Sequence, residues 1–161
     1  PKVSDMNMSF SEKSAWISLV IMIYIWGDYL FNLVGMHSSD IDMESKKSAA
    51  IVMLNTAIIA VIMAEAVFHT VLAMAYPNKE DQEGDERDKQ IEMSATKPAY
   101  AIMFTGVVIT IGHLLIVEQF PQMSDSSIQI PFIGVHILMF SALLAEIVRF
   151  VMMIKSYRSG V

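Results

Sequence analysis

The hydrophobic positions of the chain gather into four long runs that are separated by short polar segments. The runs cover residues 15–36, 49–76, 98–117 and 130–154, and only a few polar side chains interrupt each of them. A helix needs about 20 mostly apolar residues to cross a hydrocarbon core about 30 Å thick. The pattern therefore predicts four membrane-spanning helices, and an all-α four-helix bundle as the fold class.

Capping residues and a proline indicate where two of these helices begin. Ser9, followed three residues later by Glu12, predicts a capping box at the start of the first helix. Pro98 is expected in the first turn of the third helix, where its missing N–H costs nothing. Between the two halves lies an acidic central loop, residues 77–97, in which Asp85 is expected to cap a solvated helix that leads into the third span.

Composition supports a membrane protein and excludes several other classes. Of the 161 residues, 54% are hydrophobic and 17% are charged, and the mean hydropathy is +0.48; soluble domains carry about 25% charged residues. The chain has no cysteine, which excludes a disulfide scaffold, a thiolate metal site and a cysteine nucleophile. The net charge of -6 argues against nucleic acid as a partner. The high share of hydrophobic residues makes the lipid bilayer the expected partner. The length allows a single domain.

Lysine and arginine predict the orientation. With four spans, the N-terminus, the central loop and the C-terminus share one side of the membrane. That side holds nine of the eleven Lys and Arg residues, and the other side holds only Lys46 and Lys47. Because cytoplasmic loops are rich in Lys and Arg, both termini are expected in the cytoplasm.

The two halves of the chain match each other in short stretches. Residues 64–67 (AEAV) match residues 145–148 (AEIV) at an offset of 81, and residues 26–30 (WGDYL) match residues 111–115 (IGHLL) at an offset of 85. We interpret these matches as an internal repeat of two helical hairpins. Such a repeat would be related by a pseudo-two-fold axis along the membrane normal.

Ionisable side chains inside a membrane are costly and usually face the bundle interior. Four of them lie on the cytoplasmic side of the span centres and form a predicted inner layer: Glu65, His69, Glu146 and Arg149. If the repeat holds, the two glutamates approach each other near the axis. One hypothesis is a relay for protons or ions, and the alternative is an ion-pair network that holds the helices together.

A second set of polar side chains lies toward the outer half of the spans. This predicted outer layer takes one residue from each helix: Asp28, Asn55, His113 and His136. Imidazole and carboxylate are ligands for zinc, iron or copper, and the two histidines could bind haem iron axially. A transition-metal or haem site is therefore one hypothesis, and hydrogen-bonded packing is the other.

The central loop holds the most distinctive stretch, DERDKQIE at residues 85–92. It resembles the DERD-x-x-I motif of a family of small four-span bacterial inner-membrane proteins of unknown function. FSEKSAWI at residues 10–17 and YRSG at residues 157–160 are similar to the same family. The resemblance implies a multi-pass protein of the bacterial inner membrane with a cytoplasmic DERD segment, and it implies no activity. A candidate surface for docking a partner protein consists of Asp85, Glu86, Arg87 and Asp88.

Three functions stay open at this point. The first is a binding or accessory protein whose polar layers hold the helix register and whose acidic loop docks a partner. The second is a metal- or haem-binding protein, with an electron-transfer role, that uses His113 and His136. The third is a small proton or ion carrier that uses Glu65, Glu146 and His69.

The remaining alternatives concern catalysis and assembly. The sequence holds no nucleophile–base pairing, phosphate loop or nucleotide motif, so a hydrolase or kinase has no support, whereas a membrane oxidoreductase stays open. A homodimer through lipid-facing Gly and Ala positions, or a complex with another membrane protein, is also open.

Overall fold

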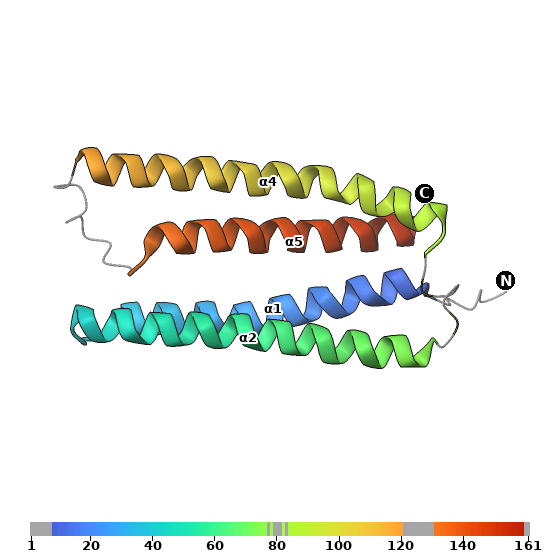
Figure 1. Ribbon diagram of the computed structural model, residues 1–161, viewed down its shortest axis with the longest axis horizontal. Coiled ribbons are helices and arrows are strands. Elements are labelled where there is room, and N and C mark those ends of the chain that lie inside the picture. Colours follow the sequence, from blue (N-terminus) through green and yellow to red (C-terminus); the bar gives the residue numbers. More distant parts are fainter. Residues whose placement is uncertain (1–7, 77, 79–81, 83, 121–130, 160–161) are drawn as a thin grey trace.

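Four long helices account for most of the computed structural model, which describes residues 8–76, 78, 82, 84–120 and 131–159. They are α1 (Phe10–His37), α2 (Met43–Ala75), α4 (Glu86–Gln119) and α5 (Ile133–Ser159). Successive helices run in opposite directions, so α1 begins and α5 ends at the same end of the molecule, which we name the terminal end (Figure 1). The predicted all-α four-helix fold is confirmed.

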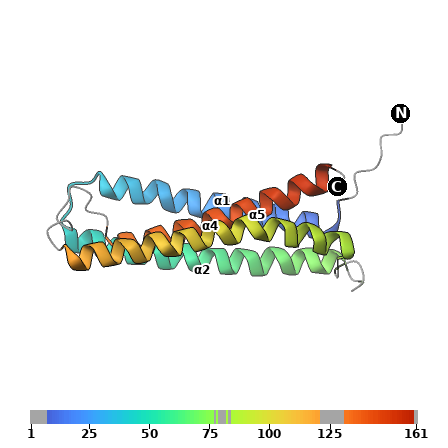
Figure 2. The ribbon, with the colours of Figure 1, turned by 90° about the horizontal axis from the view of Figure 1, so that it is seen from above.

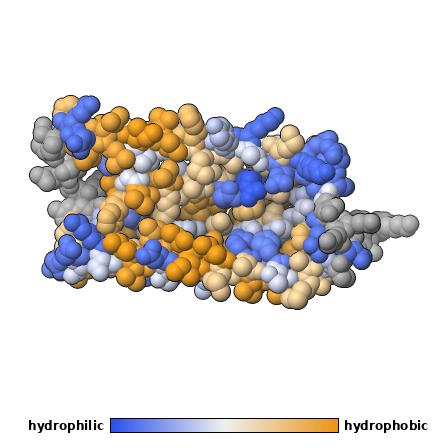
Figure 3. Space-filling view, viewed as in Figure 1, coloured by the Kyte–Doolittle hydropathy of each residue, from blue (hydrophilic) through white to orange (hydrophobic). Residues whose placement is uncertain are grey.

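The helices are long and apolar enough to cross a membrane. They contain 27 to 34 residues, which corresponds to about 40–50 Å at 1.5 Å per residue and exceeds a hydrocarbon core of about 30 Å. The face drawn in Figure 3 carries a broad apolar region, with polar side chains at both ends and a few within it. The protein is therefore a multi-pass membrane protein.

Side-chain caps define three of the helix starts. The Ser9 hydroxyl accepts a hydrogen bond from the backbone N–H of Glu12 at 3.1 Å, as predicted. Asp42 caps α2, and Asp85 caps α4. The prediction that Pro98 lies in a first turn is wrong: α4 begins at Glu86 and continues through Pro98. A proline removes one backbone hydrogen bond, and here the capped start and the buried face around it hold the helix together.

The helices are arranged in the spatial order α4, α5, α1, α2, with α2 and α4 on the outside (Figure 1). Contacts are most extensive between α4 and α5, followed by α1 with α2 and α1 with α5. Viewed from above, α5 and α1 cross each other at an angle (Figure 2). Equivalent hairpins on a two-fold axis would give the α1–α5 contact a counterpart between α2 and α4, which have far less contact. The helix contacts are thus not two-fold symmetric, and the internal repeat stays a prediction.

Two apolar clusters join the helices. One, at the terminal end, holds Ala15 and Leu19 of α1 against Ile91 of α4 and Phe150 of α5. The other surrounds Trp26, Tyr29 and Leu33 of α1 and includes residues of α2 and α5. Both clusters include α1 and α5, which are the two inner helices of the packing.

Candidate functional site

A cluster of polar side chains lies between α1 and α2, in the part of these helices nearer the terminal end. Oγ of Ser18 donates to Oε2 of Glu65 at 2.9 Å, and Nε2 of His69 lies 2.7 Å from the same carboxylate oxygen. Oγ of Ser18 also lies 3.0 Å from Nε2 of His69. On the other side of the ring, Nδ1 lies 3.4 Å from Oγ of Ser14. Two predicted inner-layer residues of α2 therefore meet two serines of α1.

One atom of this cluster has no hydrogen-bond partner among the described residues. The side chains of His69 and Glu65 are 33% and 23% exposed. Oε1 of Glu65 is buried, and it makes no hydrogen bond to any residue that the structure describes. Because an unpaired buried carboxylate oxygen is costly, Glu65 is the group of this cluster with capacity to bind a proton.

The polar groups continue from this cluster to the terminal end. Nζ of Lys13 contacts the hydroxyl of Tyr76 and lies 5.0 Å from the centre of its ring. The Tyr76 ring packs edge-on against Phe10, with ring centres 5.6 Å apart. In α1, Lys13 and Ser14 are adjacent, and Ser18 follows about one helical turn after Ser14. Polar groups therefore lie along the α1–α2 interface from its terminal end to Glu65.

The other two inner-layer residues form a separate ion pair on α5. Arg149 donates from Nε and Nη2 to Oε2 of Glu146 at 3.1 and 2.6 Å. Its Nη1 lies 3.6 Å from Oε1 of Glu92 in α4. Glu65 thus contacts side chains of the α1–α2 hairpin, and Glu146 contacts a side chain of the α4–α5 hairpin. The contacts described for the two glutamates do not include the expected approach of one to the other near a central axis.

His136, from the outer layer, is buried and hydrogen-bonded at both ring nitrogens. Nδ1 lies 3.0 Å from the carbonyl oxygen of Phe132, which can only accept, so Nδ1 carries the proton. Nε2 lies 2.7 Å from the hydroxyl of Tyr29 in α1, which donates to it. The two rings are stacked, with centres 6.1 Å apart. His136 therefore joins α5 to α1 by a hydrogen bond.

The other outer-layer residues do not gather around His136. Asp28 is exposed and accepts a hydrogen bond from Asn32, Asn55 is exposed on α2, and His113 is half-buried on α4. In the described ranges, no three His, Asp or Glu side chains are grouped so that they could hold a metal ion. The metal or haem hypothesis stays a prediction without a ligand cluster to support it.

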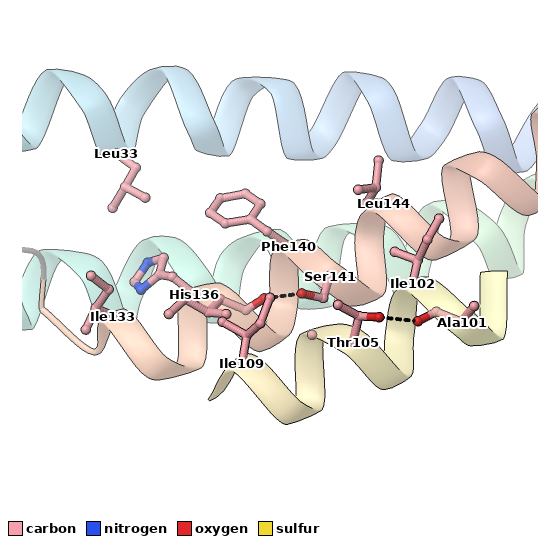
Figure 4. A pocket seen from close by; sticks show the side chains of 12 residues that line it. Leu33, Ala101, Ile102, Thr105, Ile109, Ile133, His136, Phe140, Ser141 and Leu144 are labelled. Carbon is pink, nitrogen blue, oxygen red and sulfur yellow. Dashed lines mark hydrogen bonds between the residues drawn. The ribbon is translucent and has the colours of Figure 1, made fainter. Parts of the chain in front are cut away.

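An apolar cavity of about 730 Å³ lies beside His136, between α1, α4 and α5 (Figure 4). The hydroxyls of Thr105 and Ser141 face this region but donate to backbone carbonyls of their own helices at 2.8 and 2.7 Å. Among the described residues that line it, His136 is the only ionisable one. Its two nitrogens are already engaged, so the cavity offers apolar contact rather than an ion site.

The DERD segment forms the start of α4. Asp85 accepts from the backbone N–H of Asp88 at 2.8 Å, and Asp88 accepts from that of Asp85 at 3.2 Å, which is a capping box. Asp88 also accepts from the hydroxyl of Ser11 in α1 at 3.3 Å. Two of the four predicted docking residues thus have structural roles, while Glu86 and Arg87 are exposed.

The three stretches that carry the family resemblance meet at the terminal end. Nε of Arg158 donates to Oε1 of Glu12 at 2.7 Å, which joins the end of α5 to the start of α1. Burial, and then the neighbouring carboxylate of Asp88, raise the pKa of Tyr157. A polar cleft of about 290 Å³ lies among these side chains. It is lined by Met8, Ser9, Glu12, Asp85, Arg87, Asp88, Tyr157 and Arg158.

The hydroxyl partners of these sites were not among the residues predicted from the sequence. Ser14 directly precedes the first apolar run and Ser18 lies within it four residues later, and this spacing is a signal for one polar helix face. Tyr29 had no such signal, because a tyrosine in an apolar run is equally compatible with a lipid-facing position.

No protein-family model, curated protein or solved structure matches this chain. The resemblance to the four-span inner-membrane family therefore depends on residues 10–17, 85–92 and 157–160 alone.

Proposed function

We propose that the protein is a small proton carrier of the bacterial inner membrane, in which Glu65 binds the proton and His69 passes it on. One observation carries the proposal: the buried Oε1 of Glu65 lacks a hydrogen-bond partner among the described residues. Glu65 is hydrogen-bonded to His69 and Ser18, and these side chains lie in a row of polar groups along the α1–α2 interface. An ionisable residue within a membrane span is by default a candidate functional group.

The proton path is supported by the order of the contacts. Lys13 and Tyr76 contact each other at the terminal end, which the distribution of Lys and Arg predicts to be cytoplasmic. Ser14 follows, at 3.4 Å from Nδ1 of His69, and Nε2 of His69 lies 2.7 Å from Glu65. Protons would therefore enter from the cytoplasm.

An imidazole suits this transfer because it can gain a proton on one ring nitrogen and lose one from the other. A proton taken up at Nδ1 makes the His69 ring cationic. Release of the Nε2 proton to Oε2 of Glu65 then leaves both the ring and the carboxyl group neutral. The neutral carboxyl is less costly to hold among hydrocarbon than the carboxylate.

Glu146 has no place in this path. Its carboxylate accepts two hydrogen bonds from Arg149, so it already has a counter-ion. This difference between the two glutamates gives the proposal its control.

The test is proton flux into proteoliposomes, measured with a pH-sensitive dye in the lumen under an imposed potential. We expect Glu65→Gln to reduce the flux about tenfold or more, because the amide cannot bind the transferred proton. Glu146→Gln should retain most of the flux. The proposal fails if the wild type conducts no better than empty liposomes, or if Glu65→Gln conducts as well as the wild type.

A second candidate is the accessory protein that docks a partner through its terminal end. It is supported by the convergence of residues 10–17, 85–92 and 157–159 around one polar cleft. A photo-crosslinking side chain at Glu86, which is 79% exposed, should then give one discrete adduct in cells. The same probe at Lys47, at the opposite end of the molecule, is the control, and equal adducts at both positions would contradict docking.

A further inference from the structure

Asp28 and Asn32 of α1 are exposed at a depth where only hydrocarbon would face them. The centre of the predicted span 15–36 falls between residues 25 and 26, so Asp28 lies about 4 Å and Asn32 about 10 Å from it, at 1.5 Å per residue. Both depths are within the half-thickness of about 15 Å of the hydrocarbon core. A polar side chain that faces lipid at this depth is costly, so a partner is required.

Their present hydrogen bonds leave polar capacity unused. Nδ2 of Asn32 donates to the backbone carbonyl of Asp28 at 2.8 Å and to its Oδ2 at 3.1 Å. Within the part of the chain that the structure describes, Oδ1 of Asp28 and Oδ1 of Asn32 accept no hydrogen bond, and lipid tails cannot supply one.

The same face of α1 has the shape of a helix-packing surface. Tyr24, Asp28, Phe31 and Gly35 follow at intervals of four, three and four residues, which places them on one side of the helix. Tyr24 is 77% and Phe31 is 81% exposed. A Cβ added at Gly35 would meet no atom within 4 Å, so another helix backbone can approach closely there.

A groove of about 390 Å³ runs beside this face, between α1 and α2. Asp28 and Asn32 line it together with Thr56 of α2, whose hydroxyl donates to the carbonyl of Val52 at 2.8 Å. The groove thus combines apolar walls with further acceptor oxygens, and it has room for a side chain that projects from another helix.

We propose that this face of α1 is the interface with a second copy of the chain. Two copies with the same orientation in a membrane are related by a two-fold axis along the membrane normal, so each residue near the axis faces its equivalent at equal depth. Carboxamides are self-complementary, so Asn32 can pair with Asn32. Two Asp28 carboxyl groups can pair by sharing one proton, since close carboxyls do not both ionise readily. The aromatic side chains of each copy then pack beside this polar centre.

The absence of native cysteine allows a direct test. Gly35→Cys places a thiol on the proposed interface, and Ile116→Cys, which is 51% exposed on α4, is the lipid-facing control. In proteoliposomes that contain only this protein at high dilution, mild oxidation should link the Gly35→Cys protein into dimers and leave the Ile116→Cys protein monomeric. A disulfide requires Cα atoms within about 7 Å, so random encounters contribute little.

A second variant separates the polar pair from simple proximity. Asp28→Leu in the Gly35→Cys background should lower the cross-linked fraction about tenfold, with helix content unchanged in circular dichroism. The inference is overturned if both cysteines cross-link equally, if the Gly35→Cys protein stays monomeric, or if Asp28→Leu leaves the dimer fraction unchanged. A result in native membranes where Gly35→Cys links to a different protein, with no dimer in proteoliposomes, would also overturn it.

Discussion

Two histidines of this protein, His136 and His69, have different environments. The buried His136 has a carbonyl oxygen on one nitrogen and a hydroxyl donor on the other, which specifies one neutral tautomer. His69 is one-third exposed and contacts hydroxyl and carboxylate oxygens on both sides of its ring. The first arrangement holds two helices together, whereas the second suits the gain and loss of a proton.

The Tyr29–His136 hydrogen bond leads to a stability prediction. Tyr29→Phe leaves Nε2 of His136 without a donor in a buried position, so we expect the unfolding free energy to fall by about 1 kcal/mol. Thermal unfolding in detergent measures this change. Tyr100→Phe, at a 69% exposed position of α4, is the matched control, and an equal loss of stability in both variants would contradict the role of the buried bond.

Among whole elements, small residues determine how closely two helices can approach. A Cβ added at Gly106 of α4 would lie 2.0 Å from Cβ of Ser141 in α5, so these helices pack directly against each other at this point. The other exposed faces of α4 are lined by large apolar side chains that suit lipid. The α4–α5 contact therefore depends on the absence of a side chain at one position.

Gly106→Ala should destabilise the protein by about 1–3 kcal/mol, because an added methyl group in a close contact forces the helices apart. The same substitution at Gly112, where an added Cβ meets nothing within 4 Å, should be neutral or slightly stabilising. Thermal unfolding compares the two variants. Replacing Ser141 by Gly in the Gly106→Ala background should restore stability, and failure to do so would argue against the steric cause.

The start of α2 should depend on pH. Hydrogen bonds from the Ser45 hydroxyl and backbone N–H hold the pKa of Asp42 below its ordinary value of 3.8. Because the folded-state pKa is the lower one, this capping contribution is fully present above the unfolded-state pKa and is lost as pH falls through the folded-state pKa. Asp42→Ala should therefore lower thermal stability at neutral pH, and the difference from the wild type should shrink in acid. A difference that is constant over this pH range would contradict the account.

Across the whole molecule, the terminal end holds three helices together. Arg158 pairs with Glu12, and Asp88 accepts from Ser11, so α1 is bonded to both α5 and α4. Glu12 was expected to complete a capping box with Ser9. In the structure its carboxylate binds Arg158 instead. The local pattern could not indicate this ion pair, because the two residues lie on helices that are far apart in sequence.

Loss of this ion pair should affect overall stability. Arg158→Gln leaves the Glu12 side chain, which is 10% exposed, without its cation. We expect a loss of about 1–2 kcal/mol, less than for a fully buried pair because Arg158 is 42% exposed and partly solvated. Lys89 and Glu86 form an exposed ion pair, with Nζ 3.9 Å from Oε2, so Lys89→Gln should leave the unfolding free energy unchanged. Chemical or thermal unfolding in detergent distinguishes the two, and equal effects would contradict this assignment.

Much of the architecture could be predicted from local pattern. Long apolar runs require helices in a bilayer, because every backbone polar group must be satisfied within the segment, and Ser9 and Asp85 act as caps through contacts three residues away. Pro98 was misassigned because packing of the surrounding helix outweighs the local cost of one missing hydrogen bond. The site could be predicted only as far as Glu65 and His69, which share a helix face by their spacing alone.

The sequence by itself determined the number of crossings, their approximate positions and the presence of ionisable groups among them, because hydropathy and helical spacing are local properties. Only the tertiary structure decided that Glu65 meets Ser18 and His69, that Glu146 is neutralised by Arg149, and that His136 bonds to Tyr29. Those choices depend on which helices pack together and at what rotation. Rotation about a helix axis decides whether a side chain faces a neighbour or lipid, and an apolar run that is hydrophobic on all sides carries no signal for it.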